Sequence, residues 1–212
     1  MIPLNELLIY AGVALLLVLT PGPNMIYVVS RSMSQGREAG VISLFGVVVG
    51  FFVHMFAAAL GVTALFLAVP MAYEALKFAG ALYLLWMAWQ AVRPGARSPF
   101  ETSSLPADSA SKLFAMGFVT NLLNPKIAVF YLAIFPQFIS PQYGSVFRQS
   151  LVLGLIQISI SFSVNLLIAL SAAGIASWFA RNPLWLATQR YFMGFILAAL
   201  AVRLVFEQRR AA

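Results

Sequence analysis

The stretch Asn121-Leu-Leu-Asn-Pro-Lys-Ile-Ala-Val-Phe-Tyr131 places a proline and a lysine inside a long apolar run. A charged Lys126 in hydrocarbon would cost roughly 2.5–3.5 kcal/mol, so such a residue normally faces a partner, a cavity or a ligand. Pro125, directly before it, breaks a helix. The first half of the chain carries a similar break, Thr20-Pro-Gly-Pro-Asn24. Two broken helices in corresponding positions of two halves indicate the binding site of a transporter.

The composition is typical of a protein embedded in lipid. The chain has 212 residues, of which 62% are hydrophobic and 9% charged, and its mean hydropathy is +0.92. Soluble domains are about one quarter charged, and the apolar runs of this chain are too long to serve as buried core helices. We therefore expect an all-α membrane protein that crosses the bilayer several times.

The charge and the cysteine count exclude several other classes. The net charge is +7 and the pI about 10.2, but the basic residues are scattered over loops and helix ends, which favours lipid headgroups over nucleic acid as the partner. Without cysteine there is no disulfide, zinc-thiolate or iron–sulfur site. We expect no metal and no cofactor. The first apolar run lacks a basic leader and a cleavage site, so we interpret it as a retained helix.

Six membrane spans are expected, and the first and fourth contain the two breaks. The sixth is the weakest, because Arg190 and Arg203 shorten its apolar stretch, although Arg203 could snorkel to the interface. The expected spans are Leu7–Val29, Val41–Val69, Met71–Val92, Leu113–Ile139, Ser150–Phe179 and Leu186–Phe206.

The chain is expected to form a single transporter domain, 1–212, built from two repeats. A segment rich in proline, serine and threonine, 94–112, serves as the linker between repeat 1 (1–93) and repeat 2 (113–212). With three spans in each half, the second repeat would insert upside down, giving two inverted three-helix repeats whose first helices are broken. The distribution of Lys and Arg favours a cytoplasmic linker, whereas the basic C-terminal tail favours the opposite orientation.

The two breaks predict a site for a carboxylate. Prolines at 21, 23 and 125 would free the carbonyls of Leu17, Leu19 and Asn121, which must then find water, a side chain or a ligand. A new half-helix would begin after each break, and helix N-termini attract anions. Lys126 adds a full positive charge there. The candidate substrate-binding residues are Thr20, Pro21, Gly22, Pro23, Asn24, Asn121, Asn124, Pro125 and Lys126.

Other polar or small residues in the spans have two interpretations each. Lys126 would be a snorkelling anchor if the fourth span began later. His54, the single histidine, is either a packing residue or a proton carrier. Gly46 and Gly50 favour close helix packing, within the chain or in a homodimer. A set at helical spacing in the fifth span either packs or lines one wall of a site: Gln157, Ser161 and Asn165.

These motifs, in this order, resemble the LysE/RhtB family of amino-acid exporters. The resemblance covers nearly the whole chain and rests on Thr20-Pro-Gly-Pro-Asn24, Gly36-Arg-Glu-Ala-Gly40, Gly46-x-x-x-Gly50, Gly80-Ala-Leu-Tyr-Leu84, Asn124-Pro-Lys126 and Phe135-Pro-Gln-Phe138. It implies a multi-pass protein of the bacterial inner membrane that exports amino acids such as lysine, arginine, homoserine or threonine, driven by the proton gradient.

Two departures from the family pattern bear on the cargo. Many members carry an acidic residue where this chain has Phe51, and many have an aspartate where it has Ser161. Because a cationic side chain would need such a carboxylate, we expect a neutral cargo similar to homoserine or threonine. The same loss leaves His54 as the main candidate for proton coupling.

Three classes of function compete. The leading hypothesis is a secondary transporter that exports amino acids or other small metabolites by alternating access. An intramembrane enzyme would need an activated nucleophile or a metal, and the chain has no Cys, HExxH or GxSxG motif. A channel or a structural protein would show no saturable exchange. Direct ATP drive is not expected, since there is no phosphate-binding loop.

Overall fold

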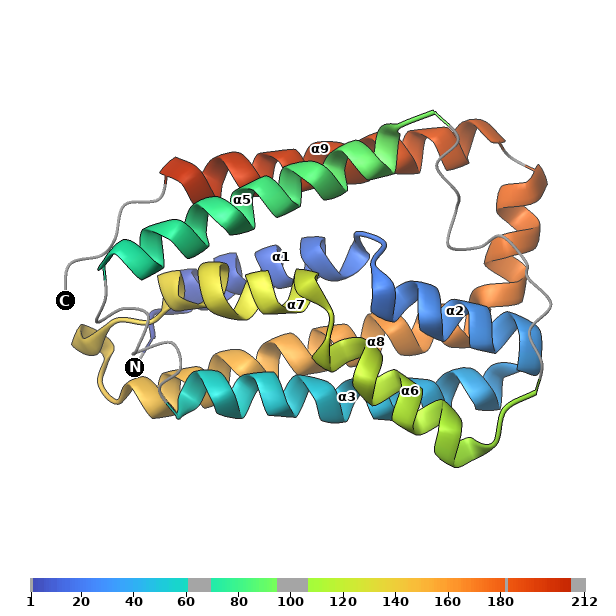
Figure 1. The fold of residues 1–212 in the computed structure, drawn as a ribbon, viewed down its shortest axis with the longest axis horizontal. Coiled ribbons are helices and arrows are strands. Elements are labelled where there is room, and N and C mark those ends of the chain that lie inside the picture. The colour runs from blue at the N-terminus through green and yellow to red at the C-terminus, as the bar shows by residue number, and fades with distance from the viewer. Residues whose placement is uncertain (1, 61–69, 95–106, 182, 207–212) are drawn as a thin grey trace.

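A computed structural model describes residues 2–60, 70–94, 107–181 and 183–206, and within these ranges the chain is helical throughout (Figure 1). Two stretches singled out from the sequence lie outside the described residues: the end of the expected second span and most of the expected linker. The helices are α1 Leu4–Leu19, α2 Pro23–Gln35, α3 Arg37–Ala59, α5 Pro70–Val92, α6 Ala110–Leu122, α7 Pro125–Val129, α8 Val146–Arg181 and α9 Pro183–Phe206, with short π- and 3-10-helical turns at Phe130–Ile134, Phe135–Phe138 and Pro141–Tyr143.

Both predicted helix breaks are confirmed. α1 and α2 meet at an angle of 52°, and α6 meets the segment Pro125–Phe138 at 44°. Thr20 and Gly22 are both extended and separate α1 from α2, and Pro23 opens α2 at a position where its missing N–H costs nothing. Pro125 opens α7 in the same way. The prolines therefore end one helix and begin the next, as their chemistry requires.

The number of spans is only partly as expected. Among the described residues, α3 and the stretch Val146–Ala172 of α8 are long and apolar enough to cross a membrane, and each bent pair would add one span, giving up to four. α5 and α9 coincide with the expected third and sixth spans but are not among these candidates. The helices extend beyond the approximate expected spans: α2 continues to Gln35, and α6 begins at Ala110, inside the predicted linker.

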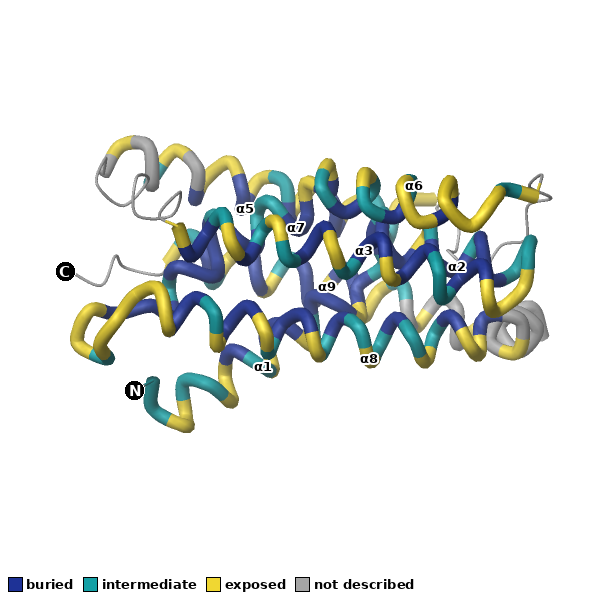
Figure 2. The backbone as a smooth tube through the Cα atoms, turned by 90° about the horizontal axis from the view of Figure 1, so that it is seen from below, coloured by how far each residue is buried: buried dark blue, intermediate teal, exposed yellow. Residues whose placement is uncertain are grey.

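The helices lie roughly along one common direction, with α3 antiparallel to α8 and α5 antiparallel to α9 (Figure 1). α3 packs against α6 and α8, and α5 packs against α9. The start of α1 and the end of α9 lie at the same end of the molecule. Buried and exposed positions alternate along α1, α3 and α8, so that each helix has an inner and an outer face (Figure 2). Large apolar residues such as Leu167 and Phe195 are exposed, as expected where lipid covers the protein.

Gly46 and Gly50 pack within the chain. A Cβ on Gly46 would lie 2.0 Å from the Phe114 carbonyl oxygen of α6, and one on Gly50 would meet the side chain of Asn121. Gly117 of α6 is as close to the backbone of Ser43. The α3–α6 contact therefore uses the GxxxG face, which leaves the motif unavailable for a homodimer.

Candidate functional site

Lys126 reaches from the second helix break to the first. Its Nζ donates to the carbonyl oxygens of Leu17 at 3.1 Å and Thr20 at 2.7 Å, with the Thr20 hydroxyl oxygen at 3.5 Å. The residue is 95% buried, with a relative exposure of 5%. Its ammonium group thus lies at the negative end of α1, where cations are favoured. Lys126 is no snorkelling anchor: it ties the two breaks together.

Two of the three carbonyls that the prolines were predicted to free have hydrogen-bond partners. The Leu17 carbonyl receives Lys126 and also the hydroxyl of Thr20. The Asn121 carbonyl accepts the backbone N–H of Asn124 and lies 3.3 Å from Nε2 of His54. Side chains therefore satisfy backbone acceptors that proline left open, which is the requirement for breaking a helix in lipid.

The two asparagines of the second break position the backbone. Asn124 caps α7, because its Oδ1 accepts the backbone N–H of Lys126 at 3.0 Å. Asn121 is fully buried against Gly50 of α3. His54 bonds to the carbonyl of Asn121 and stacks on the ring of Tyr131, with centroids 5.5 Å apart. These three side chains lie beside the break but do not line the pocket described next.

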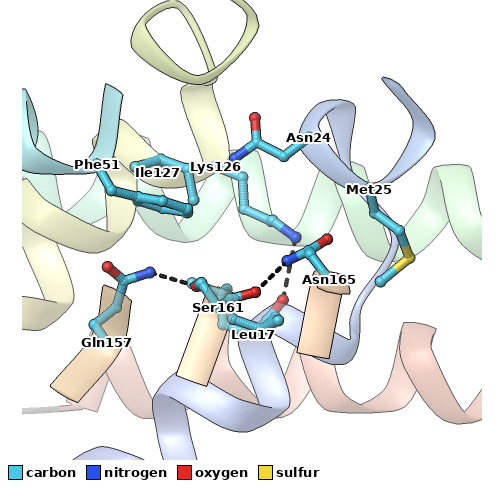
Figure 3. A pocket seen from close by; sticks show the side chains of 10 residues that line it. Leu17, Asn24, Met25, Phe51, Lys126, Ile127, Gln157, Ser161 and Asn165 are labelled. Atoms are coloured by element: carbon cyan, nitrogen blue, oxygen red, sulfur yellow. Dashed lines mark hydrogen bonds between the residues drawn. The ribbon is translucent and has the colours of Figure 1, made fainter. Parts of the chain in front are cut away.

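A small pocket lies where the two breaks meet α8 (Figure 3). The space between atoms here is about 310 Å³, part of it open to the outside. Of the predicted site residues, the pocket brings together Asn24 and Lys126. The others lie beside it: Thr20, Pro21 and Gly22 in the turn between α1 and α2, and Pro23 and Pro125 at the first positions of α2 and α7. The ten lining residues are Leu17, Val18, Asn24, Met25, Phe51, Lys126, Ile127, Gln157, Ser161 and Asn165.

The polar residues of α8 form one wall of this pocket, connected by hydrogen bonds (Figure 3). Gln157 Nε2 donates to the Ser161 hydroxyl at 2.7 Å, and Asn165 Nδ2 donates to the Ser161 carbonyl at 2.8 Å. Gln157 Oε1 accepts the hydroxyl of Tyr131 at 2.9 Å. Both interpretations of this set hold together: the residues bond to one another and also line the site.

The pocket contains one cation and no acidic side chain. Phe51 and Ser161, the two positions where the family resemblance implies a carboxylate, both face it. A substrate with a cationic side chain would find no counter-charge among the lining residues. The groups that could contact a ligand are a buried ammonium group, several amide groups and an apolar surface.

Sequence reasoning missed the apolar part of the lining. Leu17, Val18, Met25 and Ile127 carry no motif, since they are apolar residues inside apolar helices. Their proximity to the breaks, within three residues of Thr20, Gly22 or Pro125 in the sequence, was the only available signal. The polar wall could be found because its residues recur at intervals of four along an otherwise apolar helix.

The family model of the LysE type translocators matches residues 15–208. The chain belongs to this family. It is therefore a multi-pass membrane transport protein of bacterial type and not an enzyme, as the broken helices and the pocket suggest. The match spans both breaks and every residue of the pocket.

Named relatives of this LysE-type chain are efflux proteins. It is 35% identical to a homoserine/homoserine lactone efflux protein of Salmonella typhimurium over 80% of this chain and 81% of the relative. It is 28% identical to a leucine efflux protein of Enterobacter sp. (strain 638) over 92% of both chains. An uncharacterized membrane protein of Escherichia coli K12 is 26% identical over 97% of this chain and 91% of the relative. No solved structure matches the chain.

Proposed function

We propose that this protein is a secondary transporter that exports neutral amino acids across the bacterial inner membrane. The observation that carries the proposal is Lys126, the single cation in a pocket without any acidic residue, placed where both helix breaks meet. Family membership supports the transport function, and the names of the efflux relatives support amino acids as the cargo class.

The carboxylate of the cargo would bind at Lys126. The ammonium group has two short hydrogen bonds and one contact at 3.5 Å, to the Thr20 hydroxyl, which is the easiest to exchange for a ligand oxygen. α2 begins at Pro23 beside the same pocket, and a helix N-terminus favours an anion. In this proposal Asn121, Asn124 and the turn residues hold the break in shape.

The absence of acidic groups from the lining favours a neutral side chain. Met25, Phe51 and Ile127 offer apolar contacts, and the wall of α8 offers hydrogen bonds. The cargoes that name the relatives, homoserine, its lactone and leucine, all carry an uncharged side chain or ring and an α-ammonium group. Homoserine or threonine would fit the polar wall, and leucine the apolar side.

Alternating access would follow from an inverted repeat. The broken pair α1–α2 corresponds to α6–α7, α3 to α8 and α5 to α9, and corresponding elements run in opposite directions (Figure 1). α3 packs against α6, and in the same relation α8 packs against α1. This arrangement supports two repeats around a central site, with 1–93 rocking against 113–212.

Export from intact cells tests the proposal. Cells fed dipeptides of neutral and basic amino acids should release a neutral amino acid faster with the wild type than with empty vector. Lys126→Ala removes the ammonium group and should reduce this release about tenfold or more, since hydrogen bonds to charged groups contribute about 1.5–3 kcal/mol. Membrane levels of both proteins are compared by immunoblot.

Three results would contradict parts of this proposal. Equal release by wild type and Lys126→Ala would remove the carboxylate site, and release of no amino acid above the vector would favour other small metabolites as cargo. Exchange of labelled substrate that does not saturate would indicate a channel.

A homodimer, expected as a possible assembly, would need a surface other than the Gly46/Gly50 face, which α6 occupies.

A further inference from the structure

Two residues that line the pocket each have a buried amide oxygen without a hydrogen-bond partner among the described residues. These oxygens are Oδ1 of Asn24 on α2 and Oδ1 of Asn165 on α8. Both residues line the pocket, with relative exposures of 6% and 5%. A buried amide oxygen without a donor costs about 1–3 kcal/mol, so such a group in a functional pocket points to a ligand.

The orientation of Asn165 is fixed by its other atom. Its Nδ2 donates to the carbonyl of Ser161 at 2.8 Å, so the oxygen is the free end of the amide. Figure 3 shows the nitrogen turned toward Ser161 and the oxygen turned away from it. The hydrogen bond between Gln157 and Ser161 one turn earlier supports this arrangement of the α8 wall.

The residues that line the pocket therefore offer both a donor and acceptors. Lys126 supplies a cation that donates, whereas the free oxygens of Asn24 and Asn165 only accept. No lining residue is acidic, so neutral amide oxygens are the available partners for a positive group on a ligand. A zwitterion presents both complementary groups on one carbon atom.

We propose that the amide oxygens of Asn165 and Asn24 bind the α-ammonium group of the transported amino acid. The inference rests on the proposed function. It adds that the site selects for a primary ammonium group, through one asparagine on α2 and one on α8. Each oxygen accepts a hydrogen bond from one N–H group of the ammonium. A carboxylic acid of the same shape without the amino group fills the pocket but leaves both oxygens unpaired.

Competition in proteoliposomes separates the two ends of the ligand. The probe is counterflow of radiolabelled leucine or homoserine, whichever the wild type exchanges, inhibited by the same amino acid or by its deaminated counterpart, 4-methylpentanoate or 4-hydroxybutanoate. For the wild type, the deaminated acid should inhibit about tenfold more weakly, the size of one hydrogen bond to a charged group. In Asn165→Leu the inhibitory concentration of the amino acid should rise about tenfold while that of the deaminated acid stays within about twofold.

Ser163→Leu is the matched control, since it makes a similar change on the exposed face of the same helix. It should preserve the wild-type preference for the amino acid. Asn24→Leu is the second variant, in case Asn165→Leu does not assemble, and it should also lose the preference. Monodispersity in detergent shows that each variant is folded.

The outcomes distinguish this inference from the proposed function. If wild type and Asn165→Leu prefer the amino acid equally, the ammonium site is wrong while amino-acid transport stands. If Asn165→Leu weakens inhibition by both acids equally, Asn165 acts on the shape of the pocket and the inference is also overturned. If the wild type exchanges neither amino acid, the proposed function fails and the ammonium site with it.

Discussion

At the scale of single residues, Lys126 has a structural role, and the proposed function gives the same atom a binding role. Its ammonium group neutralises the carbonyl end of α1 and in the proposed mechanism also receives the carboxylate of the cargo. Gly22 makes room for it: a Cβ at this position would lie 2.9 Å from both Nζ and Cε of Lys126. The φ of Gly22 is −161°, which any residue can adopt, so the backbone angle does not require glycine here. The close approach of Lys126 does.

Gly22→Ala should therefore displace the lysine end from Leu17 and Thr20. We expect amino-acid exchange in proteoliposomes to fall about tenfold, because hydrogen bonds of a charged group are lengthened or lost. Gly12→Ala is the matched control in α1, where a Cβ would meet nothing within 4 Å. If both variants exchange at the wild-type rate, Lys126 does not depend on the space that Gly22 provides.

His54 is our candidate for proton coupling. It lies beside the second helix break, so a change in its protonation would act on that break. It lies on the carbonyl of Asn121, which Pro125 has left without its helical partner. His54→Gln keeps a donor but cannot titrate, so the dependence of uptake on an imposed pH gradient should disappear while exchange at equal pH persists. Gradient-driven transport at the wild-type level in this variant would show that another group carries the proton.

At the scale of helices, glycines allow the backbones of α3 and α6 to lie in close contact. Gly46 of α3 and Gly117 of α6 each face a backbone carbonyl of the other helix, Phe114 and Ser43 respectively. This contact fixes α6 before the second break and so determines where α7 and Lys126 begin. Because the atoms that a Cβ would meet belong to the backbone, a side chain there could be accommodated only if the helices moved apart.

Gly46→Ala should consequently destabilise the protein by about 1–3 kcal/mol, the usual cost of overpacking. The thermal unfolding midpoint of the detergent-solubilised protein measures it. Gly12→Ala again serves as the control, because it adds the same methyl group in a helix with free space. An unchanged midpoint for Gly46→Ala would mean that the α3–α6 contact is looser than described.

At the scale of the whole molecule, a charge cluster connects the two halves at the linker end. Asp108, just before α6, pairs with Arg31 of α2 at 2.7 Å and with Lys112 of α6. Its backbone N–H also donates to the side chain of Gln35. At the same end, the Arg190 guanidinium of α9 donates to the carbonyls that end α5. The repeats are thus held together at this end.

Asp108→Asn should weaken this connection and lower the thermal unfolding midpoint. The hydrogen bond from Lys112, together with the charges of Lys112 and Arg31, lowers the pKa of Asp108 below its ordinary value of 3.8. Because the pKa is lower in the folded state, the ionised carboxylate stabilises the fold at pH values above the ordinary pKa. This stabilisation disappears as the pH falls through the pKa of the folded state. The difference between wild type and variant should be constant from about pH 8 to pH 5 and shrink below that. A difference that grows on acidification would contradict the assignment.

The sequence by itself determined the class of the protein and the two helix breaks, and it placed Lys126 directly after the second break. These follow from local chemistry: an apolar composition excludes water-exposed helices, and proline cannot continue a helix wherever it folds. The polar wall of α8 was visible for the same reason, as a periodic departure from an apolar background.

Only the tertiary structure decided the partners. Lys126 and Leu17 lie far apart in the chain, and no local rule indicates that the lysine caps α1 instead of standing free for a ligand. The choice between intrachain and dimer packing for Gly46 likewise depended on where α6 lies. The unpaired amide oxygens of Asn24 and Asn165 could be recognised only once the donors of the described residues had been placed, because a hydrogen bond depends on atoms that folding brings together.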